Sequence, residues 1–317
     1  MTSQSPGRRR FLETLGAAGA LNAVPAWARG LDLGGTARAA YNPAAKFDVT
    51  VSEVEFRRNA AGRMLLARIY QPAGPGPFPA ILDLHGGAWN AKDRKAEEPM
   101  DRALAASGLL VVAVDLTLAG EAPYPASVQD ANYGVRWLKA KAKTWNGDAR
   151  KLGVYGSSSG GHLAELLSLR PTDTRYNAIP LPEAPTVDAT IAFAAMRSPI
   201  SDPFARYKNA EALKRTDMMQ NHTVYFKPWD TIFESNPQQI LERKERVSLG
   251  PLLIMQGELD DNVRPAVQEK FVATYRAAGG TCDYHLFKGA EHQWTAEEGP
   301  NTDLAREMVK AFIARYV

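Results

Sequence analysis

At 317 residues, with 45% hydrophobic and 23% charged residues, the chain can bury one sizeable core and is not composed like a disordered protein. Its net charge is only +3, and no basic face with interleaved aromatic residues suggests a nucleic-acid partner. The single cysteine, Cys282, excludes an intrachain disulfide and a cysteine-based zinc site, and the sequence contains neither a phosphate-binding loop nor a His-Glu-x-x-His zinc motif.

The first residues predict an export signal. Arg8-Arg9-Arg10-Phe11-Leu12 has a twin-arginine pattern, and residues 15–24 form a weakly apolar core that is too short to span a membrane. Ala26-Trp27-Ala28 matches a signal-peptidase cleavage site, which predicts a signal peptide at 1–28. We therefore expect a periplasmic or secreted protein without stable membrane insertion. A disordered basic tail is the alternative interpretation.

Strand-like and helix-like segments alternate through the rest of the chain. This alternation predicts one α/β domain over residues 48–317, preceded by a flexible leader at 29–47. A helix is expected at 126–142, where apolar residues recur at intervals of three and four. The fold class that follows is a doubly wound, mostly parallel sheet. Its expected strands are 48–56, 64–70, 80–84, 109–114, 151–155, 190–195, 251–256 and 282–287.

The alternation stops between residues 196 and 248. This stretch is rich in large apolar side chains, including Phe204, Tyr207, Met218, Met219, Tyr225, Phe226, Trp229 and Phe233. An insertion at this position of a doubly wound fold lies at the carboxyl edge of the sheet. We predict a cap that shapes a pocket, with Tyr225 and Trp229 as substrate contacts; helices that only pack on one another are the alternative. Trp89 and Arg197, at the ends of expected strands, are candidate substrate contacts or rim packing.

A serine-rich turn stands between the strand at 151–155 and a helix-like segment. Gly156-Ser157-Ser158-Ser159-Gly160 has the Gly-x-Ser-x-Gly pattern of a nucleophile elbow, in which small neighbours permit a sharp turn that lifts the serine oxygen above the sheet edge. Only Ser158 fits the register, so it is the candidate nucleophile. Taken alone, the pentapeptide is also compatible with an ordinary small-residue loop.

A second turn, His85-Gly86-Gly87-Ala88-Trp89, follows the strand at 80–84. Consecutive glycines let backbone N–H groups approach a substrate, and acyl transfer needs such donors for the oxygen that becomes negative. We predict that Gly87, Gly86 and Ser159 supply these N–H groups. A tight turn without a catalytic role is the alternative.

A serine nucleophile needs a base, and the chain has five histidines. His292 lies in a loop between the last expected strand and the C-terminal helix. This is the position expected for the base in a fold of this class with a serine at the elbow; a surface histidine is the alternative. His85 and His162 are expected to support loops. His285 alternates within a strand, and His222 lies in a polar stretch that suggests no partner.

The acidic partner is expected just beyond the strand at 251–256. A carboxylate there can reach the histidine loop and hold the imidazole in the required tautomer. The spacing within the motif favours Asp260, and Asp261 is expected to cap the helix that follows. Ser158, Asp260 and His292 also occur in the chain order that this kind of elbow uses.

These motifs resemble those of α/β hydrolases of the hormone-sensitive-lipase-like group, near the acetyl-esterase and feruloyl-esterase-like branch. The sequence departs from many members at Ala88, where a third glycine is common, and at Leu116-Thr117, where a Tyr-Arg pair is frequent. The resemblance covers about residues 48–317 and rests on His85-Gly86-Gly87, Gly156 to Gly161, Asp115 to Ala119, Tyr124 to Asp130, Asp260 with Val263, and His292.

The resemblance implies a serine carboxylesterase that acts on small or medium acyl or aryl esters through an acyl-enzyme, and the N-terminal signal adds the expectation that it is exported. It implies neither a cofactor nor a metal, and it leaves the oligomeric state open. The expected partner is a small-molecule ester and not a nucleic acid. Because the same triad cleaves activated amides, an arylformamidase-like amide hydrolase is one alternative. A non-catalytic binding protein on a hydrolase scaffold is another.

Overall fold

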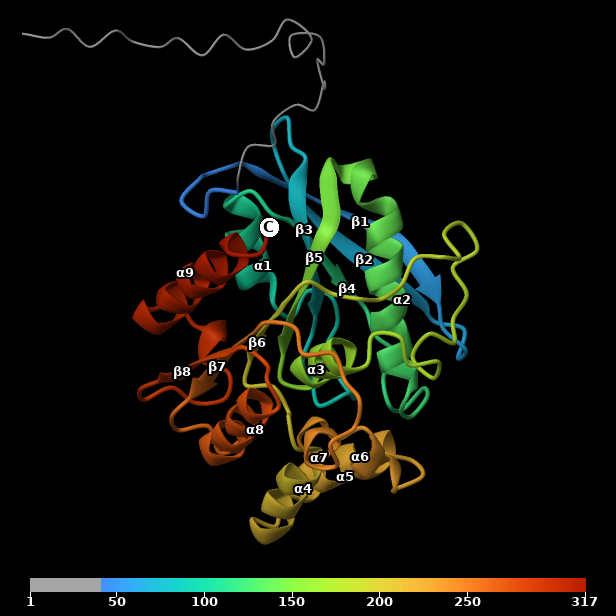
Figure 1. Ribbon diagram of the computed structural model, residues 1–317, viewed down its shortest axis with the longest axis vertical. Helices are drawn as coiled ribbons and strands as arrows, with labels where there is room; N and C mark the ends of the chain where they lie inside the picture. Colours follow the sequence, from blue (N-terminus) through green and yellow to red (C-terminus); the bar gives the residue numbers. More distant parts are fainter. Residues whose placement is uncertain (1–40) are drawn as a thin grey trace, which may run out of the picture. The chain divides into compact units, whose positions relative to one another are not determined.

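The computed structural model describes residues 41–317. The predicted signal peptide and most of the predicted leader lie outside this part of the chain. Residues 41–317 form an eight-stranded sheet with helices on both faces, which confirms the predicted α/β class (Figure 1).

The sheet is mostly parallel. Its strands are β1 (Val49–Arg58), β2 (Met64–Pro72), β3 (Phe78–Leu84), β4 (Leu110–Val114), β5 (Gly147–Ser157), β6 (Ala194–Arg197), β7 (Leu252–Gly257) and β8 (Cys282–Phe287). Their order across the sheet is β1-β2-β4-β3-β5-β6-β7-β8. Strand β2 is antiparallel to β1 and to β4, and the other neighbouring pairs are parallel.

Helices cover the two faces of the sheet (Figure 1). One face carries α1 (Glu98–Ala106) and α9 (Pro300–Ala314), and the other carries α2 (Ala126–Lys141), α3 (Ser159–Leu169) and α8 (Pro265–Ala277). The elements η2 (Ala142–Trp145) and η3 (Trp294–Ala296) are short 3-10 helices. Within residues 41–317, no helix combines the length and the apolar character needed to cross a membrane.

The central strands are buried on both sides, which explains their nearly continuous apolar sequences. Along β4, Val112 and Val114 pack in the core that includes α2 and α3. The intervening Val111 and Ala113 pack in the core that includes α1 and α9. Successive strand residues point to opposite faces, so a strand covered by helices on both sides needs apolar residues at every position.

Strand β6 begins later than the sequence predicted. The expectation was 190–195, whereas the strand runs from Ala194 to Arg197. Apolar composition does not fix the register of a short strand; pairing with β5 does, because it sets Ala194 beside Val154 and Arg197 beside Ser157. Arg197 therefore belongs to the sheet and not to the inserted segment.

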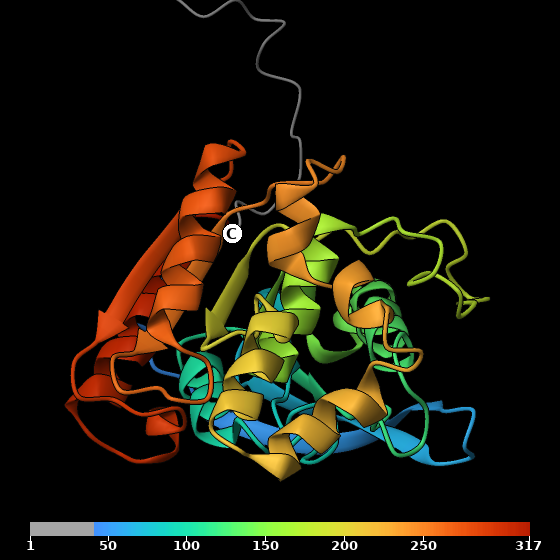
Figure 2. The ribbon, with the colours of Figure 1, turned by 90° about the horizontal axis from the view of Figure 1, so that it is seen from below.

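The segment after β6 forms four helices within the described residues. They are α4 (Pro203–Ala212), α5 (Thr216–Tyr225), α6 (Thr231–Glu234) and α7 (Pro237–Glu242). Helix α7 packs against α3 and α8. In Figure 1 these helices lie at the bottom, beneath α3, and Figure 2 shows them from that side. We call residues 203–242 the cap.

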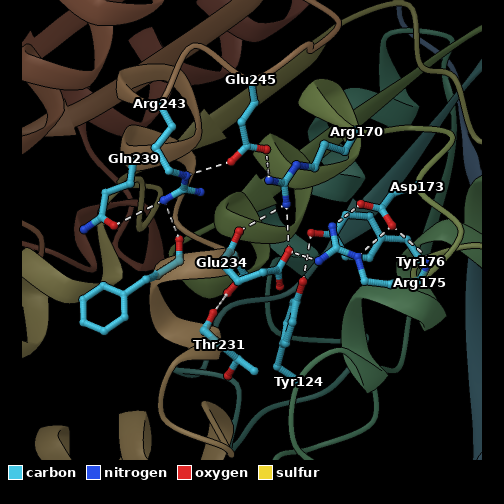
Figure 3. Close-up of polar contacts among 12 residues, drawn as sticks. Tyr124, Arg170, Asp173, Arg175, Tyr176, Thr231, Glu234, Gln239, Arg243 and Glu245 are labelled. Atoms are coloured by element: carbon cyan, nitrogen blue, oxygen red, sulfur yellow. Dashed lines mark hydrogen bonds and ion pairs between the residues drawn. The ribbon is translucent and has the colours of Figure 1, made fainter.

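Ion pairs attach the cap to the end of α3 (Figure 3). Arg170, the residue after α3, donates to Glu234 of α6 at 2.9 Å and also pairs with Glu245, which follows α7. Arg175 pairs with the same Glu234. The end of the helix that follows the serine-rich turn is thus linked through charged side chains to α6 of the cap and to the segment that follows the cap.

Candidate active site

Ser158 stands at the turn between β5 and α3 in a left-handed backbone conformation, with φ of 52°. A Cβ on Gly160 would lie 1.8 Å from the Leu84 carbonyl oxygen, and one on Gly156 would lie 2.7 Å from the Gly160 carbonyl oxygen. Only glycine fits at both positions. The Ser158 N–H donates to the Arg197 carbonyl at 2.9 Å, which holds the turn in place. This is the strained geometry of a nucleophile elbow.

The structure brings the three predicted triad residues together. The His292 Nε2 atom lies 3.0 Å from Ser158 Oγ, and His292 Nδ1 lies 2.8 Å from Asp260 Oδ2. The other Asp260 oxygen accepts hydrogen bonds from the N–H groups of Asn262 and Val263, at 3.0 and 2.7 Å. The loop after β7 therefore fixes the carboxylate, which in turn orients the imidazole toward the serine.

The two titratable partners have the protonation states that a base needs. Burial acts to raise the pKa of Asp260, but the hydrogen bond and the charge interaction with His292 outweigh it and leave that pKa below its ordinary value. Burial lowers the pKa of His292, and Asp260 offsets this only in part. At neutral pH the site thus pairs a carboxylate with a neutral imidazole that can accept the serine proton.

The predicted oxyanion donors lie beside the elbow. Gly87 has φ of 110°, and a Cβ there would meet the Ala91 carbonyl oxygen at 2.0 Å, so only glycine fits. A Cβ on Gly86 would lie 3.3 Å from that of Ser158, which shows how closely this backbone approaches the serine. Within residues 41–317, neither glycine N–H donates a hydrogen bond. The Ser159 N–H, in the first turn of α3, has no acceptor within the helix.

A small cavity adjoins Gly86 and Ser159. Its wall is mostly apolar and is formed by Trp89, Leu116, Leu118 and Leu163 together with His85, Thr117 and Ser127. The centre of a water molecule can occupy only about 10 Å³ of this space. The cavity is therefore about large enough for one water molecule or a methyl group.

Trp89 and Tyr225, predicted to contact substrate, lie mostly in the interior. Their rings stack with centroids 4.7 Å apart and planes inclined by 5°. Tyr225 is fully buried, with its hydroxyl 2.8 Å from Ser127 Oγ, and the Trp89 indole donates to His162 at 3.2 Å. The structure corrects the prediction for Tyr225, because its neighbours cover the ring. Trp89 forms part of the wall of the small cavity beside Gly86.

Trp229 and Arg197, the other two candidate substrate contacts, differ in how far their side chains are exposed. Trp229 is partly exposed on the cap and packs against Tyr207, with ring centroids 4.7 Å apart, so it keeps a surface that a substrate can touch. Arg197 is only 3% exposed. Its guanidinium donates to the His292 carbonyl at 2.5 Å and lies 3.4 Å from the Glu97 carboxylate. Arg197 thus packs against protein groups, which agrees with the packing alternative and not with a substrate contact.

Asp261, the competing acid, points away from the triad. Its side chain is 68% exposed and pairs with Arg215 of the cap segment. It does not cap α8, because the residue at the helix N-cap is Arg264 and no side chain accepts a hydrogen bond there. That expectation was wrong. The ion pair with Arg215 draws the carboxylate toward the cap.

The sequence analysis suggested no partner for His222 and did not identify Glu97; both are buried polar residues with specific contacts. His222 lies in α5, where its ring nitrogens are 2.7 Å from the Met218 carbonyl and 3.2 Å from Arg206. Glu97 precedes α1 and accepts a hydrogen bond from Ser157, next to the elbow serine. Neither residue lies in a recognisable motif, because apart from Met218 their partners are distant in the sequence.

The arrangement provides the groups that acyl transfer requires: a nucleophile, a base, an acid that orients the base, and N–H donors for a developing negative charge. Within residues 41–317, no cluster of three or more His, Cys, Asp or Glu side chains is arranged to hold a metal ion.

The BD-FAE family model matches residues 68–274, which is most of the described chain. The chain belongs to the BD-FAE family. The matched BD-FAE segment contains the glycine turn, the elbow and Asp260, and it ends before His292.

Among curated relatives, carboxylesterase NlhH of Mycobacterium tuberculosis is 33% identical over 103 residues, or 32% of each chain. Hormone-sensitive lipase of Bos taurus is 28% identical over 116 residues, which are 36% of this chain and 15% of the lipase. The match thus spans about a third of NlhH and less of the lipase. These relatives agree with the resemblance to hormone-sensitive-lipase-like hydrolases.

A solved structure, esterase B from Lactobacillus rhamnosis, superimposes on this BD-FAE protein with a TM-score of 0.70. The alignment covers 85% of this chain and 87% of the esterase, at 21% sequence identity. It confirms the α/β-hydrolase fold.

Proposed function

We propose that this protein is a serine ester hydrolase that cleaves esters of small or medium acyl groups through an acyl-enzyme. The observation that carries the proposal is the chain of hydrogen bonds from Ser158 through His292 to Asp260, at 3.0 and 2.8 Å. The carboxylesterase relatives support the same reaction class.

In the first half of the reaction, Ser158 Oγ bonds to the ester carbonyl carbon while His292 Nε2 takes the serine proton. The N–H groups of Gly86, Gly87 and Ser159 are placed to stabilise the oxyanion. The carbon–oxygen bond to the alcohol then breaks, and the imidazolium returns its proton to the leaving alcohol. Asp260 stabilises the imidazolium and keeps its own charge throughout.

In the second half, His292 takes a proton from water, and the water oxygen attacks the acyl-enzyme carbonyl. Breakdown of the second tetrahedral intermediate releases the carboxylic acid and restores the serine hydroxyl. The same groups act in both halves, so the site needs one base and one set of N–H donors.

The small cavity supports a preference for short acyl groups. It adjoins two of the three proposed oxyanion donors, Gly86 and Ser159, and has room for little more than a methyl group. An acyl chain that enters this space must therefore be short.

Initial rates on p-nitrophenyl acetate, butyrate and octanoate, beside an aryl formamide and an acetylated xylan, test the proposal. We expect acetate to be hydrolysed at the highest kcat/KM, with butyrate lower and octanoate lower than acetate by about tenfold or more. Absence of turnover for every ester would refute the proposed reaction. A formamide cleaved faster than all esters would assign the chain to the amide hydrolases instead.

Export by the twin-arginine pathway is a further part of the proposal. It is supported by Arg8-Arg9-Arg10 and by the Ala26-Trp27-Ala28 cleavage pattern, both outside the described residues. Cell fractionation should find a chain that begins near Arg29 outside the cytoplasm. Arg8→Lys with Arg9→Lys should retain the full-length chain inside; normal export of that variant would contradict the assignment.

A further inference from the structure

We propose that a buried ion pair, Glu97 with Arg197, positions the catalytic histidine and the nucleophile elbow relative to one another. Both are positioning residues, since neither touches the reacting atoms. The inference rests on the proposed ester hydrolysis and adds to it a device that sets the alignment of the triad.

Arg197 contacts both sides of the reacting pair. Its backbone carbonyl accepts the Ser158 N–H at 2.9 Å, and its side chain donates to the His292 carbonyl at 2.5 Å. The first contact holds the elbow against the end of β6. The second holds the histidine loop, which has no strand or helix of its own at this point. A single residue therefore sets the distance between nucleophile and base.

Glu97 fixes the guanidinium and a second point of the elbow. Its Oε1 atom accepts a hydrogen bond from the Ser157 hydroxyl and lies 3.4 Å from Arg197 Nη2. Glu97 comes from the loop before α1, so the pair connects three segments that are distant in the sequence. Glu97 is 5% exposed and Arg197 is 3% exposed. Burying such a pair yields little net stability, which favours a geometric role.

Two further buried carboxyl groups lie near this pair. Asp83 of β3 and Asp101 of α1 are fully buried, and within residues 41–317 their carboxyl oxygens have no hydrogen-bond partner. Burial, together with the neighbouring acidic groups, raises the pKa of each well above its usual range. Burial and the neighbouring acidic groups thus disfavour a negative charge on either group, whereas the Glu97 carboxylate oxygen lies 3.4 Å from the Arg197 guanidinium.

The pair also affects the charge around the base. The charged groups that act on His292 are Asp260 in the loop after β7, Arg197 of β6 and Arg206 of α4. Asp260 favours the imidazolium, and the two arginines oppose it. In the pH profile of kcat/KM, the acid limb is the side on which activity falls because His292 becomes protonated. Removing the Arg197 charge should therefore shift this acid limb to higher pH. Removing the Glu97 charge, which leaves Arg197 unbalanced, should shift it to lower pH.

The pair borders a cavity. Glu97 and Arg197 form part of the wall of a cavity of about 230 Å³, together with Lys92, Ala96, Pro99, Met100, Gln293, Thr295 and Ala296. A guanidinium ion can enter a cavity of this size. It can then occupy the position that Arg197→Ala leaves empty.

The main test compares Arg197→Met with Arg197→Lys in the mature chain, using p-nitrophenyl acetate. Arg197→Met should lower kcat by about 10- to 100-fold with KM changed less than about threefold, because misplacement of about 1 Å costs on this order. Its acid limb should move to higher pH. Arg197→Lys keeps the charge but not the two-pronged geometry, so kcat should fall while the acid limb stays in place.

Two further measurements separate positioning from folding. Glu97→Gln should lower kcat and move the acid limb to lower pH, opposite to Arg197→Met. Guanidinium chloride at millimolar concentration should raise kcat of Arg197→Ala several-fold and leave the wild type unchanged. If Arg197→Met does not fold, the pH profiles of Arg197→Lys and Glu97→Gln still test the positioning role. The acid limb should stay in place in Arg197→Lys and move to lower pH in Glu97→Gln.

Arg170→Met is the matched control, because Arg170 is also a largely buried arginine paired with two glutamates, at the cap (Figure 3). It should lower the melting temperature without moving the acid limb. An unchanged kcat and acid limb in Arg197→Met, or the same shifts in Arg170→Met, would overturn the positioning role. A wild type that cleaves no ester would instead overturn the proposed function.

Discussion

The catalytic loops and the cap are neighbours that are held in different ways. In the loops, single hydrogen bonds and glycine backbone set each position: Ser158 is held by its N–H, and Asp260 by two backbone N–H groups. In the cap, stacked and edge-to-face rings around Tyr225 fill the interior, and ion pairs at Arg170 close the outer side.

This difference separates the consequences of mutation. A change in the loops removes a chemical group without leaving a large void, so activity falls while the fold persists. A change in the cap interior removes many van der Waals contacts, so stability falls first. The predictions below test this division, from the largest expected effect to the smallest.

Ser158→Ala should lower kcat/KM by about 10⁴- to 10⁶-fold, because only the N–H donors and substrate binding remain. The melting temperature should change by no more than about 2 °C, since one oxygen atom is lost at a strained turn. Initial rates and thermal melting of the purified variant check both statements. Activity within tenfold of the wild type would show that another residue is the nucleophile.

Asp260→Asn should lower kcat by about 10⁴-fold, because an amide stabilises the wrong histidine tautomer and not the imidazolium. Asp261→Asn is the matched control. It breaks only an exposed pair with Arg215, which contributes about 0–1 kcal/mol to stability, and should leave kcat within about twofold. If Asp261→Asn were the less active variant, Asp261 and not Asp260 would be the acid that orients His292.

Tyr225→Ala should lower the free energy of unfolding by about 3–5 kcal/mol, because the ring is fully buried. Trp229→Ala, at a partly exposed ring of the same cap, should cost much less stability. It should instead change the ranking of p-nitrophenyl esters by about tenfold. Urea denaturation and the chain-length series distinguish the two outcomes. A ranking change with Tyr225→Ala and none with Trp229→Ala would place the pocket wall elsewhere.

Acid should lower the stability of the protein through His162, which contacts Ser235 of the cap, and His222, which lies within the cap. Burial lowers the pKa of His162 to about 4 and that of His222 to about 3. Both are neutral when folded, and in the unfolded chain they take up protons below about pH 6.5, so stability falls as the pH drops from 6.5 toward 4. Each contributes up to about 1.4 kcal/mol per pH unit. Urea midpoints at pH 7 and pH 5 measure this, and His222→Gln should show the shallower dependence. Equal slopes would exclude His222 as a contributor.

The catalytic loops could be predicted from the sequence because their determinants are local. Ser158 and Gly86 lie in short motifs, and the chemistry of acyl transfer requires those residue types at those spacings. The strand at 282–287 was also predicted with its observed bounds, since its apolar and polar residues alternate between clear breaks. Strand β6 was misplaced because its register depends on pairing with β5.

The cap and the supporting ion pair could not be predicted in this way. From the sequence, Tyr225 is only one of several aromatic residues in an insertion. Its burial depends on Trp89 and Ser127, which are about a hundred residues or more away along the chain. Arg197 was identified by its position at a strand end, yet its role follows from Glu97, which no motif marks. Long-range partners decide whether a side chain faces a substrate or the interior.

Covalent labelling with a fluorophosphonate probe, followed by peptide mass spectrometry, tests the central claim most directly. The probe reacts with a serine that a neighbouring base activates, so the account predicts one label per chain, located on Ser158. The label should be lost in His292→Ala and in Ser158→Ala, and bound probe should abolish ester hydrolysis. A label on Ser157 or Ser159, or undiminished hydrolysis after complete labelling of Ser158, would contradict it.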